Sequence, residues 1–197
     1  MASKLTEIFE KYKMHPADAA AKSQAWFNQQ LFTLNQTKVN ANTIMRQSNT
    51  ELSRVNKLVP GSMYLYEYSA LNAATLPYWD KYPLVIPFRQ VSGGFYGLNL
   101  HYLTPQLRVI LLDKLMTFAT NKTLDKTTIL KFTWQTAAAA AQNKHISACV
   151  KMYLSTQVRS VFMYIKPIDW VGAMMLPVES FQGASKSQVW KDSRKFT

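Results

Sequence analysis

Residues 60–68 read PGSMYLYEY, and this stretch decides how the rest of the sequence is interpreted. After the Pro60-Gly61 dipeptide, tyrosines alternate with other side chains, as Met63, Tyr64, Leu65, Tyr66, Glu67 and Tyr68. Successive side chains of a β-strand point to opposite faces of the sheet, so this alternation predicts a strand with one aromatic face.

Two further strands follow the first. Residues 84–88 (LVIPF) fit a strand that Pro87 interrupts, which favours an edge position or a β-bulge because proline has no backbone N–H to donate. Ser92-Gly93-Gly94 can reverse the chain, and residues 95–100 return as a third strand. We therefore predict a small, strongly curved, barrel-like antiparallel sheet within residues 62–103.

The sequence after this sheet has mainly helical patterns. Thr104-Pro105 is a typical helix start, with a capping side chain and a first-turn proline. The buried stripe predicted for this helix, which runs to about residue 120, comprises Leu107, Ile110, Leu111, Lys114, Leu115 and Phe118. Further segments are predicted as helices at 123–141 and 146–155, a strand or helical continuation at 158–165, a short capped helix at 168–174, and a basic amphipathic tail at 185–196 with Val189 and Trp190 on one side.

A long helical arm is predicted before the sheet. Residues 17–59 contain neither Gly nor Pro, and their narrow apolar stripe comprises Phe27, Leu31, Leu34, Met45, Leu52, Val55 and Val59. The flanking Asn and Gln residues are mediocre helix formers, so the helix needs a surface to pack on, either a neighbouring subunit or the chain's own body. The predicted fold is thus α+β, with an arm at 1–59 and a compact body at 60–197, which divides into the sheet at 62–103, a helical part at 104–165 and a C-terminal segment at 166–197.

The 197-residue chain is strongly basic, with a formal net charge of +12 and a sequence pI of about 9.8. Such a chain attracts polyanions or acidic protein surfaces. No run of consecutive basic residues marks a nucleic-acid arm, so charge alone does not choose between these partners. No apolar run reaches the roughly 18–20 residues that span a bilayer, and the first residues lack a secretion signal, so we expect a soluble protein made in the cytosol.

Reactive groups are sparse. The single Cys149 cannot form an intrachain disulfide and is expected to be a buried thiol, and the three histidines lack metal-ligand spacing. The acidic residues are scattered singly, and turns, caps or surface pairs account for Asp80, Asp113, Asp125, Asp169 and Asp192. We therefore expect no catalysis, no cofactor, no metal and no small-molecule substrate. The competing hypothesis, an enzyme such as one that degrades peptidoglycan, would need paired carboxylates or metal ligands.

Aromatic residues interleave with basic ones in the predicted sheet. Tyr64, Tyr66, Tyr68, Tyr78, Trp79 and Tyr82 lie near Lys81 and Arg89 in the sequence. Bases stack on aromatic rings while Lys and Arg hold phosphates, so these residues fit a nucleic-acid platform. Alternating tyrosines are also ordinary core and interface packing, and both interpretations stay open.

Five blocks of this sequence resemble a virion structural protein family of large contractile-tailed, T-even-like bacteriophages. The blocks read PGSMYLYEY, LPYWDKYPLVIPF, GGFYGLNLHYL, LPVESFQ and VWKDSRK, and they fall within residues 60–110 and 155–195. Members of that family carry labels that range from tail or baseplate component to protector of packaged DNA ends. The resemblance implies a non-enzymatic virion component made in the host cytoplasm, and it brings no catalytic residue. It also implies fold-defining roles for the segments that carry Tyr78, Trp79, Asp80, Tyr82 and Pro83, and Gly97, Asn99, His101 and Tyr102.

Two functional hypotheses follow. The first is a structural subunit of the tail, near the baseplate, that contacts other virion proteins in multiple copies through its arm. Its interface and fold candidates are Phe27, Leu31, Leu34, Met45, Leu52, Val55, Tyr78, Trp79, Tyr82, Trp190 and Arg194. The alternative is a DNA-end-binding or neck-associated protein that contacts packaged DNA through its basic surface.

Overall fold

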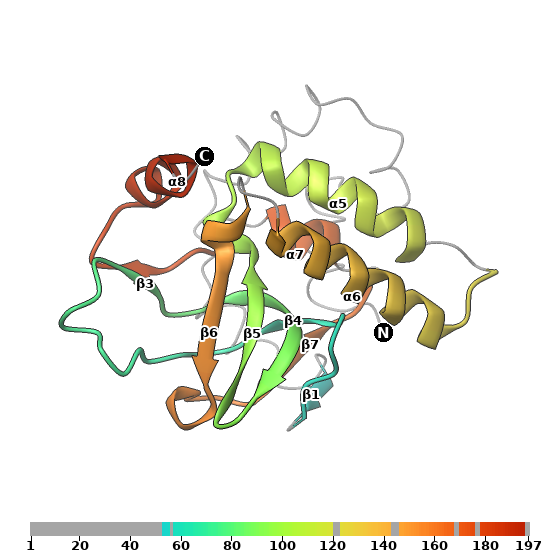
Figure 1. Ribbon diagram of the computed structural model, residues 1–197, viewed down its shortest axis with the longest axis horizontal. Helices are drawn as coiled ribbons and strands as arrows, with labels where there is room; N and C mark the ends of the chain where they lie inside the picture. The colour runs from blue at the N-terminus through green and yellow to red at the C-terminus, as the bar shows by residue number, and fades with distance from the viewer. Residues whose placement is uncertain are drawn as a thin grey trace.

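The computed structural model describes residues 53–55, 57–119, 123–142, 146–167, 170–175 and 178–195. A six-stranded antiparallel sheet, ordered β1-β7-β2-β4-β5-β6, forms the centre of the molecule (Figure 1). Its strands are β1 (Ser53–Val55), β2 (Met63–Leu65), β4 (Leu84–Val91), β5 (Gly94–Asn99), β6 (Val150–Leu154) and β7 (Phe162–Ile165). Short strands β3 (Trp79–Asp80) and β8 (Phe181–Gln182) pair separately. The antiparallel sheet is confirmed, but the barrel is wrong because β1 and β6 are open edges.

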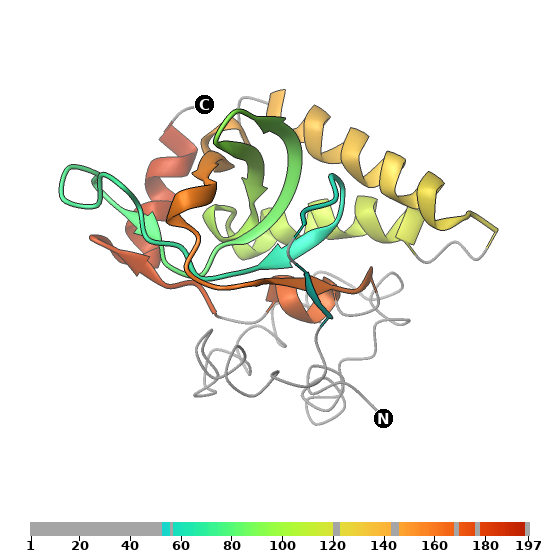
Figure 2. The same ribbon diagram turned by 90° about the horizontal axis from the view of Figure 1, so that it is seen from below.

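Helices cover one face of the sheet (Figure 2). They are α5 (Pro105–Ala119), α6 (Lys126–Gln142), α7 (Trp170–Met175) and α8 (Lys186–Lys195), with 3-10 turns η1 (Leu100–Tyr102), η2 (Ser147–Cys149) and η3 (Ser155–Gln157). The rings of Phe118 and Phe132 stack at 4.7 Å and join α5 to α6. None of the helices among the described residues is both long and apolar enough to cross a membrane.

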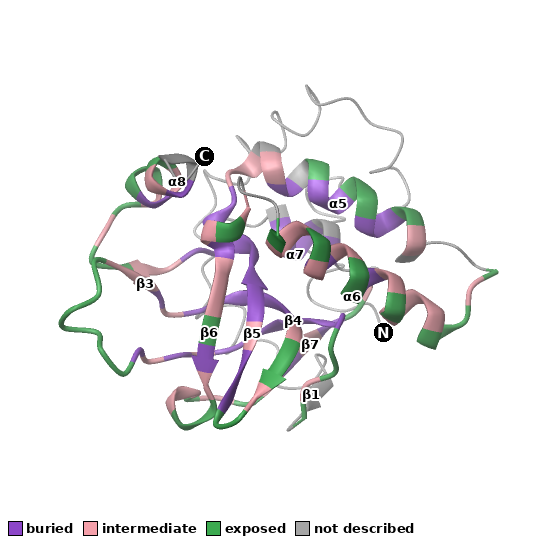
Figure 3. Ribbon diagram, in the orientation of Figure 1, coloured by how far each residue is buried: buried purple, intermediate pink, exposed green. Residues whose placement is uncertain are grey.

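The alternation at residues 63–68 separates two cores. Met63 and Leu65 face the helices, whereas Tyr64, Tyr66 and Tyr68 lie in a second, aromatic cluster on the other side of the curved sheet. The centre of the Tyr66 ring lies 5.0 Å from the centre of the Phe162 ring and 5.6 Å from that of the Tyr153 ring. Figure 3 shows the buried strands and the exposed residues 71–77, which form a loop to one side. The predicted aromatic face is therefore confirmed, and the structure shows that it is buried in the interior.

Pro87 marks a bulge in an interior strand. The register between β4 and β5 shifts between Pro87 and Arg89, and β4 lies between β2 and β5. The bulge is confirmed and the edge position is wrong. The Phe88 carbonyl, which lies in the irregular stretch, accepts a 2.7 Å hydrogen bond from the indole Nε1 of Trp134 on α6. A side chain from a neighbouring helix thus satisfies the backbone group in this stretch.

Two helical predictions are wrong in part. Residues 146–155 form η2 and β6, because pairing with the distant strand β5 overrides their local helical pattern. The strand option for 158–165 is confirmed at β7. In α5, Ile110 is 52% exposed and Lys114 is also exposed, whereas the neighbouring Leu112 and Met116 are buried, so the buried stripe is wider and rotated from the predicted one.

Most of the predicted arm lies outside the described residues, including Phe27, Leu31, Leu34, Met45 and Leu52. Where the structure describes its end, the helix is wrong: β1, which contains Val55, pairs with β7. The free edge of β7 offers hydrogen-bond partners to the backbone of residues 53–55. Because this segment has a weak intrinsic preference for a helix, pairing with the sheet is favoured. The division of the chain at residue 59 stays a prediction.

Replacing Gly61 by alanine is expected to destabilise the fold more than the same change at Gly93. Both glycines have a positive φ, 85° and 75°, which costs an alanine about 1 kcal/mol or more. A Cβ on Gly61 would also lie 2.5 Å from the Leu130 carbonyl oxygen, whereas one on Gly93 meets no atom within 4 Å. Urea unfolding of the two variants measures the difference, and equal losses of stability would contradict the close packing of the Pro60-Gly61 turn on α6.

Candidate nucleic-acid interface

A groove rich in basic residues, which we call the basic groove, lies where the β4–β5 hairpin, η3 and the start of β7 meet. The hairpin and η3 are at the foot of the sheet in Figure 1. The groove has a volume of about 650 Å³ and carries three cationic side chains, Lys57, Arg89 and Arg159. Its other lining residues are uncharged: Leu58, Pro60, Pro87, Gln90, Gly94, Phe95, Ser155, Val158, Ser160, Val161 and Phe162. No described residue of its wall is acidic, so every charged side chain on that wall is cationic, which favours an anionic ligand.

The sheet holds the two arginines in place. Arg89 follows the Pro87 bulge, and its guanidinium lies 4.4 Å from the centre of the Tyr96 ring. The Arg159 backbone N–H donates a 2.8 Å hydrogen bond to the Glu67 carbonyl, and its Nη2 donates to Gln157 Oε1 at 3.1 Å. Both residues are exposed and line the groove.

Two turns that are distant in sequence build one wall of the groove. The Ser155 N–H donates to the Gly93 carbonyl at 2.9 Å, which joins η3 to the β4–β5 hairpin. Ser160 Oγ accepts from the Glu67 N–H at 2.8 Å and donates to the Val161 carbonyl at 2.9 Å. Arg, Lys and Ser side chains are common donors to phosphate oxygens of nucleic acids. The chemistry of the groove therefore fits a phosphate backbone.

A second polar cluster lies inside the protein. Asp80 Oδ2 is 2.7 Å from His101 Nδ1 and accepts from Asn99 Nδ2 at 3.2 Å, and Asn99 Nδ2 also donates to the Tyr153 hydroxyl at 2.9 Å. The side chains of His101 and Asp80 are 0% and 1% exposed. A carboxylate and an imidazole in contact can serve general-base catalysis, but a substrate needs access to them. These contacts instead tie β3 to η1, and the absence of catalysis stays a prediction.

An ion-paired cluster lies beside this one. The buried Arg108 pairs with Glu179, whose other carboxylate oxygen lies 2.8 Å from Lys186 Nζ. Burial alone would raise the pKa of Glu179, but Arg108, His101 and Lys186 outweigh that effect and lower it to about 2. Glu179 is therefore ionised at neutral pH and joins the C-terminal segment to α5.

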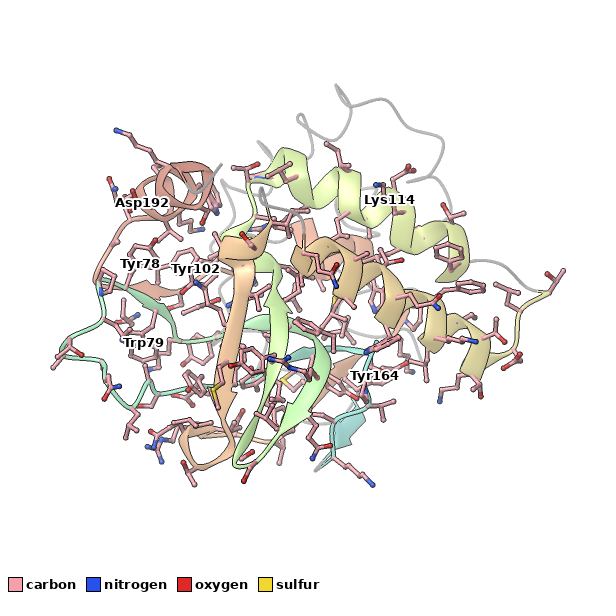
Figure 4. The ribbon with its side chains drawn as sticks, in the orientation of Figure 1. Tyr78, Trp79, Tyr102, Lys114, Tyr164 and Asp192 are labelled. Carbon is pink, nitrogen blue, oxygen red and sulfur yellow. The ribbon has the colours of Figure 1, made fainter. Side chains whose placement is uncertain are left out.

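The remaining predicted residues fall in different places. Tyr82 is buried in the main core, and the Trp190 indole donates a 2.9 Å hydrogen bond to the His101 carbonyl. Tyr64, Tyr66 and Tyr68 are at most 8% exposed, so they form core and no stacking platform. Tyr78 and Trp79 are half-buried. In Figure 4 they lie to one side of β6, and β5 lies on the other side of that strand. Arg194 belongs to α8, and its side chain lies outside the described residues.

Cys149 is a buried, free thiol, as predicted. Burial raises its pKa to about 12, against smaller opposing effects of Lys151 and Arg108, so it stays protonated at neutral pH. Within the part of the chain that the structure describes, no three His, Cys, Asp or Glu residues gather in a way that could hold a metal ion.

Sequence reasoning named Arg89 but did not find Lys57 or Arg159. These residues are separated by up to about a hundred positions, and only the β5–β6 and β2–β7 pairings bring them to one groove. Their sole sequence signal is the diffuse basic excess, which does not reveal where the charges meet.

Comparison with known proteins adds a family to this geometry. A family model described as phage T4 terminal DNA protecting protein matches residues 3–194. Neither a curated protein nor a solved structure matches the chain. The match confirms the resemblance to a T-even-like phage family and extends it over the N-terminal segment and the middle helices. The chain belongs to the phage T4 terminal DNA protecting protein family.

Proposed function

We propose that this protein protects the ends of phage DNA by binding them in the basic groove. The observation that carries the proposal is the meeting of Lys57, Arg89 and Arg159 around a groove whose described wall contains no acidic residue. The family description supports a terminal position on the DNA, and the net charge of +12 supports attraction to a polyanion.

Protection of this kind works by occupancy and needs no catalysis. A groove of about 650 Å³ is the size of a small-molecule pocket, roughly 300–1,000 Å³, and fits a few nucleotides better than a full helical turn. Phosphates held by the arginines would place the body of the protein over the terminal phosphodiesters. A nuclease that begins at the end would then find its first bonds covered.

The family description favours this DNA-end role over the predicted tail or baseplate role, because it names terminal DNA. A protein with this task stays with the packaged DNA or meets it in the infected host. We therefore propose a location in the virion or in the phage-infected cell, with DNA as the main partner and virion proteins as further ones.

Removing two charges from the groove tests the proposal. The variant Arg89→Gln/Arg159→Gln should bind linear duplex about 10-fold or more weakly than wild type in fluorescence anisotropy, because two phosphate contacts are lost. The slope of log K against log salt should also become shallower by about 2. The control Lys114→Gln/Lys131→Gln removes two exposed charges from α5 and α6, outside the groove, and should change affinity much less.

Two results would contradict the proposal. The first is a failure of the wild type to bind linear duplex even at low salt, which would show that the groove is no DNA site. Alternatively, the two double variants could lose equal affinity, in which case the binding reflects total charge and not the groove.

A further inference from the structure

A second hollow, which we call the aromatic cleft, opens between β6 and the loop that precedes β3. It has a volume of about 320 Å³, and five aromatic residues and one lysine contribute to its wall: Tyr68, Tyr78, Trp79, Tyr102, Tyr153 and Lys151. Figure 4 shows Tyr78, Trp79 and Tyr102 grouped beside β6. Tyr102 and Tyr153 are buried, whereas Tyr78 and Trp79 are half-buried and present ring surface to the cleft.

The aromatic cleft and the basic groove are neighbours. Leu154 lines the cleft and the next residue, Ser155, lines the groove, so about 3.8 Å of backbone separates their Cα atoms. Tyr68 of the cleft forms an isolated β-bridge with Val158 of the groove. One extended ligand that crosses η3 can therefore contact both hollows.

The chemistry of the cleft differs from that of the groove in a way that matches the two parts of a nucleotide. Lys151 Nζ lies 4.2 Å from the centre of the Tyr102 ring, so the cleft combines stacking surface with a cation. Asp80 is the one acidic residue of its described wall, and its carboxylate is 1% exposed and already bonded to His101 and Asn99. Aromatic rings with nearby cations are the usual receptors of single-stranded nucleic acid.

We propose that the aromatic cleft stacks unpaired bases of a single-stranded extension at a DNA end, while the basic groove holds the phosphates of that strand. This inference rests on the proposed function. Bases inside a duplex are already stacked and paired, so only an unpaired extension can offer its faces to Tyr78 and Trp79. The small volume of the cleft admits a single base in preference to a base pair.

The test compares two labelled duplexes of equal paired length, one blunt and one with a four-nucleotide unpaired extension. Wild type should bind the extended duplex about 10-fold more tightly, as expected for one stacked base. Trp79→Leu should abolish this preference and leave the Kd for the blunt duplex within about 2-fold, and Trp79→Phe should keep it. The matched control is Phe132→Leu, a part-buried aromatic residue on α6 that lines neither hollow and should keep the preference.

A second measurement does not depend on the folding of variants. A 5-iodouracil in the extension is crosslinked to wild-type protein by light, and mass spectrometry should place the crosslink at Tyr78 or Trp79. Equal affinity of wild type for the two duplexes, or a crosslink confined to the basic groove, overturns the inference and leaves the proposed function standing. Loss of binding to both duplexes overturns the proposed function itself, and a cleft that captures a protein segment would show no preference for the extension.

Discussion

Replacing Arg108 by methionine is expected to lower the free energy of unfolding by about 3–5 kcal/mol, because the change strands a buried carboxylate. Arg108 is 1% exposed, and its Nε donates to the Leu103 carbonyl at 3.0 Å. Its two Nη atoms donate to the carbonyls of His101 at 3.0 Å and Met174 at 3.2 Å. One side chain thus joins η1, α5, α7 and, through Glu179, the segment before β8. Urea unfolding followed by circular dichroism measures the loss.

The control for this prediction is Lys131→Met, which removes an exposed cation from α6 and should change stability by no more than about 0.5 kcal/mol. The double variant Arg108→Met/Glu179→Gln should lose less than the two single losses combined, because it leaves no unpaired buried charge. If Arg108→Met costs under about 1 kcal/mol, the cluster does not stabilise the fold as described.

The stability of the protein is expected to fall in acid through Glu179. The pKa of Glu179 drops from its ordinary value of 4.5 to about 2 in the folded protein, so folding favours its ionised form. The stabilisation is fully present above pH 4.5 and disappears as the pH falls from there to about 2. A shift of this size corresponds to about 3 kcal/mol, and the side chain is only 3% exposed, so solvent screens it little.

Unfolding curves of wild type and Glu179→Gln between pH 6 and pH 2.5 check this effect. Other carboxylates titrate in both proteins, so the difference between the two curves isolates Glu179. Wild type should lose about 2.5 kcal/mol more than the variant across this range, since the last part of the effect is lost below pH 2.5. Parallel curves would show that Glu179 does not carry the ion pair.

Local patterns predicted the parts of the fold that depend on neighbouring residues. The alternation at 63–68 separates two cores, Gly93 turns the β4–β5 hairpin, and Asp125 caps α6 by accepting from the Thr127 and Thr128 N–H groups. The two segments expected to define the fold also meet, since Asp80 contacts both Asn99 and His101. The strand alternation, the hairpin turn and the helix cap need only a few adjacent residues to specify them, whereas the roles of the two segments came from the family resemblance.

The pairing of strands that are distant in sequence could not be predicted from local patterns. The local pattern of Val150–Leu154 predicts a helix, yet this segment forms the edge strand β6. It pairs with β5, and there Phe95 lies opposite Tyr153 with the two ring centres 5.4 Å apart. The basic groove depends on the same pairings, so its residues could not be grouped in advance. The sequence signals of charge and aromaticity were present, but only the topology decides which tyrosines are core and which basic residues share a groove.

Exonuclease digestion of an end-labelled linear duplex tests the protection of DNA ends through the basic groove most directly. The label should be released much more slowly when wild-type protein or Lys114→Gln/Lys131→Gln is present. The variant Arg89→Gln/Arg159→Gln should give little protection at the same concentration. Digestion at an unchanged rate with wild type, or equal protection by the two double variants, would contradict the account.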